Sequence, residues 1–120
     1  MKKIVIMLLI TLTLLTGCSQ QEMYDDKKDT TPLTVEYIME NYTYQIIDVR
    51  TKEEFDTGHV KGAINIPVSE ITTVDLPKDT YLIVYCKSGG RSKSAYEILT
   101  SMGYNVFNLR DFDSITLDKE

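Results

Sequence analysis

Hydrophobic and polar positions divide this chain into an apolar N-terminal stretch, a polar linker and a longer region of mixed pattern. The apolar stretch covers residues 4–15, and the charged linker covers residues 19–31. In the remaining region, four short runs are rich in β-branched, aliphatic and aromatic residues, as buried strands are. These predicted strands cover residues 44–49, 63–66, 81–85 and 105–109.

Helical patterns lie between the predicted strands. Thr51 and Glu54 have the spacing of a capping box, and Gly103 is the expected stop of the longest helix. The predicted helices cover residues 34–41, 51–57 and 92–102, with a helical turn within 68–76. Strands that alternate with short helices predict an α/β fold, in which a small parallel sheet is flanked by short helices on both faces.

The stretch from Tyr81 to Leu99 joins a strand, a tight loop and a helix start without a linker. Its loop, Cys86-Lys-Ser-Gly-Gly-Arg91, contains two glycines, so its backbone can reach conformations closed to other residues. Several backbone N–H groups are expected around one point, with a thiol at the edge. Such a cradle suits an anion or an anionic sulfur, which makes this loop the candidate site.

Another polar group lies at the end of a different predicted strand. Asp48-Val-Arg50 ends the run that begins at Tyr44, as Cys86 ends the run that begins at Tyr81. Sites in parallel sheets gather at the carboxyl ends of the strands. If these two strands are neighbours, Asp48, Arg50 and Cys86 lie on one edge of the sheet.

The first 18 residues have the features of an export signal. Lys2 and Lys3 precede the apolar stretch, whose 12 residues are too few to cross a bilayer of about 30 Å as a helix. The stretch ends in Leu15-Thr-Gly-Cys18, which resembles the lipobox of bacterial lipoproteins. In such proteins the cysteine receives a diacylglyceryl group and becomes the mature N-terminus. An ordinary cleaved signal with a chance cysteine is the alternative.

These features predict three segments. Residues 1–17 are expected to be the signal peptide, residues 18–32 the lipidated Cys18 with a flexible tether, and residues 33–117 the folded domain. The mature protein is then expected to be lipid-anchored to a bacterial membrane, with its domain on the extracytoplasmic side.

Composition limits the classes of partner and the kinds of chemistry that can be expected of this protein. The formal net charge is −5, and removal of residues 1–17 leaves 11 basic against 18 acidic residues, a net charge of −7. An acidic protein is a poor candidate for nucleic-acid binding. With Cys18 lipidated, Cys86 is the single free thiol and is expected to be reactive. His59 is the only histidine, so there is no Cys/His metal pattern, and neither a metal nor a cofactor is predicted.

Two motifs occur in a specific order. The first is Asp48-Val-Arg50, followed by Glu54-Phe55 and then by the run Gly58-His-Val-Lys-Gly-Ala-Ile-Asn-Ile-Pro67. The second is Val84-Tyr-Cys86-Lys-Ser-Gly-Gly-Arg91-Ser92, followed by Ala95, Leu99 and Gly103-Tyr. With this order and spacing, residues 33–109 resemble the rhodanese-like family of single-domain sulfurtransferases.

The resemblance implies a reaction. In that family the loop cysteine, here Cys86, takes a sulfane sulfur from a donor such as thiosulfate and holds it as a persulfide. It then passes the sulfur to a nucleophile such as cyanide or another thiol. The loop backbone is expected to cradle this sulfur, through Lys87, Ser88, Gly89, Gly90 and Arg91.

The loop and edge side chains have expected roles of their own. Arg91 is expected either to bind an anionic donor or to brace the loop, and Lys87 either to attract thiosulfate or to be solvated. Asp48 and Arg50 are expected to fix the loop and the sheet edge rather than to take part in chemistry. A helix N-terminus alone stabilises an exposed anion by only about 0.3–1 kcal/mol. Loop N–H groups and Arg91 are therefore expected to supply most of the stabilisation of the Cys86 thiolate.

The C-terminal sequence departs from the family. Members commonly follow the last strand with a Gly-Gly turn and a helix that carries a tryptophan. This chain has Leu109-Arg-Asp-Phe-Asp-Ser-Ile115 instead, and it contains no tryptophan. The final helix is expected to be short or absent, which leaves open how well one face of the sheet is covered.

A membrane-tethered sulfurtransferase is the favoured function, with a small sulfur compound or a protein persulfide as its partner. A phosphatase would use five residues between the cysteine and the arginine, whereas four separate Cys86 from Arg91, and the smaller loop suits sulfur better than phosphate. A non-catalytic binding module usually lacks the cysteine. A persulfide-relay module needs the same loop as the enzyme, so the sequence does not separate these two.

Overall fold

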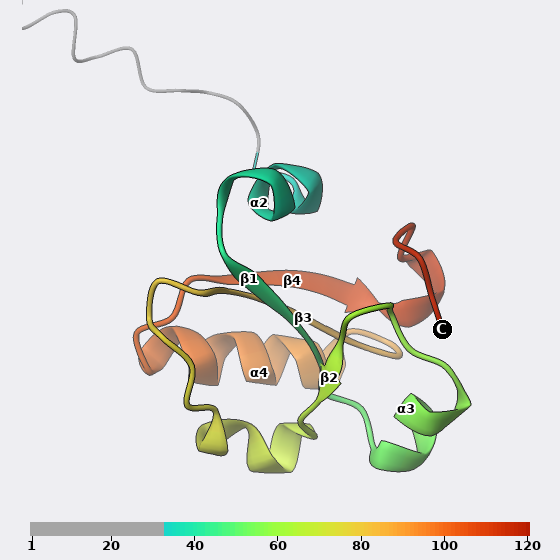
Figure 1. Cartoon of the computed structure of the whole chain (residues 1–120). Coiled ribbons are helices and arrows are strands. Elements are labelled where there is room, and N and C mark those ends of the chain that lie inside the picture. Colours follow the sequence, from blue (N-terminus) through green and yellow to red (C-terminus); the bar gives the residue numbers. More distant parts are fainter. Residues whose placement is uncertain (1–32) are drawn as a thin grey trace, which may run out of the picture. The chain divides into compact units, whose positions relative to one another are not determined.

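A parallel sheet of four strands forms the centre of the computed structural model, which describes residues 33–120 (Figure 1). The strand order is β2-β1-β3-β4, and every pair of neighbours is parallel. The strands are β1 (Tyr44–Asp48), β2 (Ile64–Asn65), β3 (Tyr81–Cys86) and β4 (Val106–Asp111). The prediction of a small parallel α/β sheet is confirmed. The predicted signal peptide, Cys18 and the tether lie outside the described residues.

Three α-helices and two short 3₁₀ helices connect or follow these strands. They are α2 (Val35–Asn41), α3 (Lys52–Thr57), η2 (Val68–Thr73), α4 (Gly90–Ser101) and η3 (Phe112–Ser114). The capping box of Thr51 and Glu54 is present at the start of α3. Helix α4 begins two residues before the expected Ser92, because Gly89 takes a left-handed conformation (φ 97°) and serves as the N-cap.

The two faces of the sheet carry separate apolar clusters. Helix α4 and η2 lie on one face and α2 on the other (Figure 1). Ala95 and Leu99 of α4 are fully buried against Val84 of β3. Ile38 of α2 packs with Ile83 on the opposite face. Because β3 is covered on both faces, its carboxyl end is held in place from two sides.

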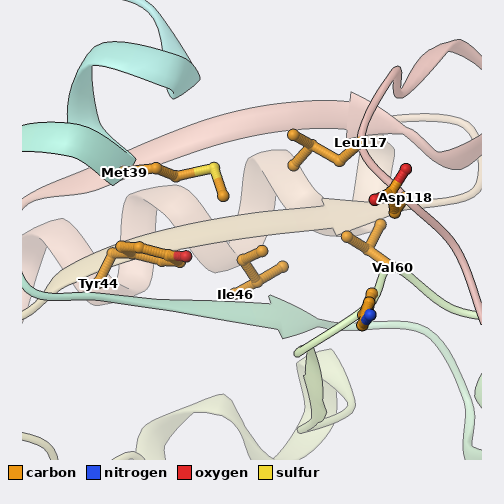
Figure 2. Close-up of a pocket in the computed structure, with 7 residues that line it drawn as sticks. Met39, Tyr44, Ile46, Val60, Leu117 and Asp118 are labelled. Atoms are coloured by element: carbon orange, nitrogen blue, oxygen red, sulfur yellow. The ribbon is translucent and has the colours of Figure 1, made fainter.

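The chain after β4 covers part of the α2 face. Strand β4 runs two residues past the expected Leu109, and the following helix η3 has only three residues, so the prediction of a short final helix is confirmed. The last residues then pair with the loop before β2, where Glu120 and His59 exchange backbone hydrogen bonds of 2.7 and 2.9 Å. A cavity of about 300 Å³ remains on this face, between Met39 of α2 and Leu117 (Figure 2).

A buried polar network joins β1, β3 and the loop before β2. Arg50 donates to both carboxylate oxygens of Asp48 through Nε (2.9 Å each) and to Oδ2 again through Nη2 (2.6 Å). The Tyr85 hydroxyl donates to Asp48 Oδ2 (2.9 Å) and accepts from the backbone N–H of Val60 (3.0 Å). Burial raises the pKa of Tyr85, so its hydroxyl stays protonated and keeps donating. Arg50 also donates to the carbonyl of Gly58 (2.6 Å).

We predict that Tyr85→Phe destabilises the domain by about 1–3 kcal/mol, because it leaves the Val60 N–H without its buried acceptor and removes one donor to Asp48. Urea unfolding followed by circular dichroism measures the change. Tyr42→Phe is the matched control, since Tyr42 is 46% exposed and its change is expected to stay within about 0.5 kcal/mol. Equal stability of Tyr85→Phe and the unchanged protein would show that the network adds no net stability.

Candidate active site

The thiol of Cys86 lies at the carboxyl end of β3, inside the loop that follows this strand. Cys86 is fully buried. The backbone N–H of Gly89 donates to Sγ at 3.0 Å, and the N–H of Ser92 donates to the same atom at 3.3 Å. The loop therefore curls around the sulfur and turns its amide groups toward it. These contacts have the geometry expected of a backbone cradle.

These hydrogen bonds change the acidity of the thiol. Burial raises the pKa of Cys86, because it disfavours the charged thiolate. The Ser92 hydroxyl and the amides of Ser92, Gly89 and Ser88 act in the opposite direction and outweigh burial, so the pKa lies below its usual value. A lower pKa increases the fraction of thiolate, which is the nucleophilic form, at neutral pH.

Ser92 is the contact that the sequence analysis missed. Its hydroxyl donates to the carbonyl of Gly89 (3.1 Å) and also lies within reach of the Cys86 sulfur. A hydroxyl has one proton, so it serves one of these two acceptors at a time. The available signal was its place in the first turn of α4, because helical side chains lean back toward the N-terminus.

Arg91 forms an ion pair with Glu54 of α3. Its two terminal nitrogens contact the two carboxylate oxygens at 2.6 and 3.1 Å, a bidentate arrangement. The hydrogen bond from Arg91 is the main reason why the pKa of Glu54 falls to about 2. The guanidinium charge is thus balanced by a carboxylate, and Arg91 braces the loop against α3. The hydrogen bonds to Sγ come from the amides and Ser92, and Arg91 acts on Cys86 through its charge rather than through a hydrogen bond.

The other residues singled out in the sequence take different places. Lys87, Ser88 and Gly90 are exposed on the loop. Asp48 and Arg50 lie on the same sheet edge as Cys86, as expected from neighbouring strands, because Asp48 is in register with Tyr85. Their side chains bond to one another, to Tyr85 and to Gly58, as described above, and within residues 33–120 no hydrogen bond joins them to the Cys86 sulfur.

His59 lies apart from the thiol. Its ring nitrogens contact the carbonyl of Phe55 (3.0 Å) and the carboxylate of Glu120 (3.2 Å), and the ring stacks on Phe55. Among residues 33–120, no cluster of three or more potential metal ligands occurs. In the same part of the chain, no helix is both long and apolar enough to span a membrane.

Comparison with known proteins places this site in a family. The family model described as "Rhodanese-like domain" matches residues 31–111. The chain belongs to the rhodanese-like domain family. The matched region contains the Asp48–Arg50 pair, the Cys86 loop and all four strands.

Individual relatives support the same assignment. The chain is 42% identical over 78 residues to the thiosulfate sulfurtransferase PspE of Escherichia coli (strain K12), a match that covers 61% of this chain and 75% of that protein. It is 33% identical over 76 residues to the human thiosulfate:glutathione sulfurtransferase, covering 50% of this chain and 66% of that protein. It covers only about a fifth of several longer relatives.

A solved structure has the same fold. The structure titled "rhodanese with anions from E. coli" superposes with a TM-score of 0.61 at 38% sequence identity. The match covers 65% of this chain and 98% of that one. The rhodanese-like domain therefore accounts for most of the described part of the chain.

We predict that Ser92→Ala raises the pKa of Cys86, because it removes a hydroxyl that can donate a hydrogen bond to the thiolate. The pH dependence of iodoacetamide alkylation reports this pKa. Ser94→Ala is the matched control, since its hydroxyl contacts the carbonyl of Gly90 rather than the sulfur. An unchanged alkylation profile in Ser92→Ala would mean that the amides alone set the acidity of the thiol.

Proposed function

We propose that this protein is a sulfurtransferase that carries sulfane sulfur on Cys86 as a persulfide. One observation carries the proposal: the amides of Gly89 and Ser92 converge on the sulfur of Cys86, the free cysteine of residues 33–120. Donors arranged in this way stabilise an anionic sulfur such as the Cys86 thiolate, which is both the attacking and the leaving group of the proposed reaction.

The proposed reaction has two balanced steps. The Cys86 thiolate attacks the outer sulfur of thiosulfate, the sulfur–sulfur bond of the donor breaks, and sulfite leaves with the bonding electron pair. An acceptor thiolate or cyanide then attacks the terminal sulfur of the persulfide, and the Cys86 thiolate is the leaving group. No external oxidant or reductant is required. Because Cys86 is fully buried, both steps require its sulfur to become accessible to the donor and to the acceptor.

The names of relatives support the donor and the kind of acceptor. PspE is named a thiosulfate sulfurtransferase, and the human relative a thiosulfate:glutathione sulfurtransferase. We therefore propose thiosulfate as a donor and a thiol as an acceptor for this chain. A persulfide-relay module that receives its sulfur from another protein is the alternative, because it uses the same loop.

We predict that the purified domain produces thiocyanate from thiosulfate and cyanide, and that Cys86→Ser abolishes this activity because serine forms no persulfide. Mass spectrometry of the unchanged protein after incubation with thiosulfate is expected to show one added sulfur atom on Cys86. Ser94→Ala serves as the matched control and should retain both the activity and the adduct.

Two outcomes would contradict the proposal. The first is the absence of both turnover and adduct with every sulfane donor tried. The second is Cys86-dependent hydrolysis of an aryl phosphate without sulfur transfer, which would favour the phosphatase. An adduct that forms without turnover would instead favour the persulfide relay over the enzyme.

We also propose that the domain is tethered to a bacterial membrane through a lipid on Cys18. The support is the sequence Leu15-Thr-Gly-Cys18 at the end of a short apolar stretch, with Lys2 and Lys3 before it. The following residues, 19–31, are polar and charged, as tethers are. The domain would then work on the extracytoplasmic side.

We predict that the full chain expressed in bacteria incorporates radiolabelled palmitate and sediments with membranes. Cys18→Ser removes the thiol that would be lipidated, so it should lose the label, whereas Cys86→Ser should keep it. Equal labelling of the unchanged chain and Cys18→Ser would contradict the proposed anchor.

A further inference from the structure

Strand β4 contains a bulge next to the Cys86 loop. Its register with β3 shifts between Val84 and Tyr85: Val84 pairs with Asn108, but Tyr85 pairs with Arg110, so Leu109 is the extra residue. Bulges of this kind bend a strand and re-aim its side chains. Here the bulge redirects the residues that follow Asn108.

Arg110 has an unusual backbone conformation at this bulge. It is the only non-glycine residue with a positive φ (72°) among residues 33–120. The left-handed region disfavours residues with a Cβ and suits glycine. The Oδ1 atom of Asn108 accepts the N–H of Arg110 (2.8 Å) and helps to hold this turn. Family members commonly have two glycines after the last strand, whereas this chain has Arg110 and Asp111 there.

The Arg110 side chain lines a cavity that adjoins the candidate active site. The cavity has a volume of about 440 Å³ and lies between α4 and β4, with Gly89, Lys93 and Tyr96 among its other lining residues. Gly89 is the residue whose N–H donates to the Cys86 sulfur, and the Cβ of Arg110 lies 3.7 Å from the position that a Cβ on Gly89 would take. The cavity therefore begins directly behind the loop.

The charges of this cavity favour an anion. Lys93 and Arg110 contribute two positive charges, and Glu97 contributes one negative charge. Within the described part of the chain, neither cation takes part in an ion pair. Tyr96, which is 40% exposed, adds an aromatic wall. A volume of this size is in the range of small-molecule pockets.

The position of the cavity determines which of the two substrates, the sulfur donor or the sulfur acceptor, can reach it. Gly89 both donates its N–H to the Cys86 sulfur and lines the cavity, so a molecule that reacts at the sulfur must extend past this residue to reach Arg110. The negative oxygens of thiosulfate are only two bonds from its outer sulfur, which makes this donor short for such a path. A longer molecule can reach the cavity if a spacer separates its reacting sulfur from its charge.

We propose that Arg110 and Lys93 bind a carboxylate of the sulfur acceptor, a low-molecular-weight thiol with its carboxylate several bonds from the sulfur. This inference rests on the proposed function. With the carboxylate bound, the acceptor thiolate attacks the terminal sulfur of the Cys86 persulfide. A new sulfur–sulfur bond forms, the old one breaks, and Cys86 leaves as the thiolate.

The test measures the two half-reactions separately. The protein is loaded with thiosulfate, freed of excess donor and checked by mass spectrometry for one added sulfur. Discharge is then followed with 6-mercaptohexanoate, whose carboxylate is separated from the sulfur by five methylene groups, and with the neutral analogue 6-mercaptohexanol. Arg110→Gly removes the charge while its backbone suits the left-handed turn, and Arg110→Lys restores a charge. Lys78→Gln is the control, since Lys78 lies over Tyr104 and near Gly103, beyond the other end of α4.

Arg110→Gly is expected to raise the KM for 6-mercaptohexanoate about five- to tenfold, as loss of one charge-assisted contact at a partly exposed site would. The KM for 6-mercaptohexanol and the rate of loading should not change, and Arg110→Lys should recover most of the loss. An equal effect on both thiols, or a raised KM for thiosulfate alone, would overturn the assignment.

Failure of the proposed function would be visible separately, as absence of the sulfur adduct in the unchanged protein. In that case 6-(methylthio)hexanoate, which has no thiol and cannot react, is titrated into the protein and followed by NMR. Shifts of the Gly89 and Lys93 amides that disappear in Arg110→Gly would support the anion subsite. Absence of such shifts in the unchanged protein would overturn it.

Discussion

Hydrogen bonding of the Cys86 sulfur to the loop that follows it is the constraint on which the rest of the site depends. Burial alone would favour the neutral thiol, and the hydrogen-bond donors from Ser92, Gly89 and Ser88 oppose that effect. These donors point inward because Gly89 takes a left-handed conformation and starts α4 immediately. The helix is fixed in turn by buried Ala95 and Leu99, so the packing of one helix determines the chemistry of one thiol.

The same loop is braced by charged pairs that do not contact the sulfur. Arg91 reaches across to Glu54, and this carboxylate also completes the capping box of α3, so one side chain positions two elements. The buried Asp48–Arg50 pair ties the neighbouring sheet edge to Tyr85 and Gly58. Buried ion pairs recover little net stability after desolvation. Their contribution here is a fixed geometry around the loop.

Local signals in the sequence were sufficient to predict the helices and strands, but not the contacts between them. Thr51 and Glu54 identified α3, because a capping box involves residues only three apart. The pairing of Glu54 with Arg91 spans 37 positions, and no local pattern encodes it. The start of α4 was misplaced because its N-cap, Gly89, acts through backbone conformation and has no side chain to recognise. The predicted last strand ended two residues too early, at Leu109 instead of Asp111. An arginine in a left-handed bulge has the sequence signal of neither a turn nor a strand.

Arg110 also has a simpler explanation, namely protection of an exposed sheet edge. Strand β4 is an edge strand, and bulges and charges on edges prevent pairing with other chains. A glycine or asparagine would form the same bulge without the cost of about 1–2 kcal/mol that a left-handed conformation imposes on other residues. Edge protection thus accounts for the bulge and for a charge on this strand, but not for a charged residue that takes a left-handed conformation and lines a cavity together with Lys93. The proposed binding of an anion accounts for this residue, since it requires a long cationic side chain at this position.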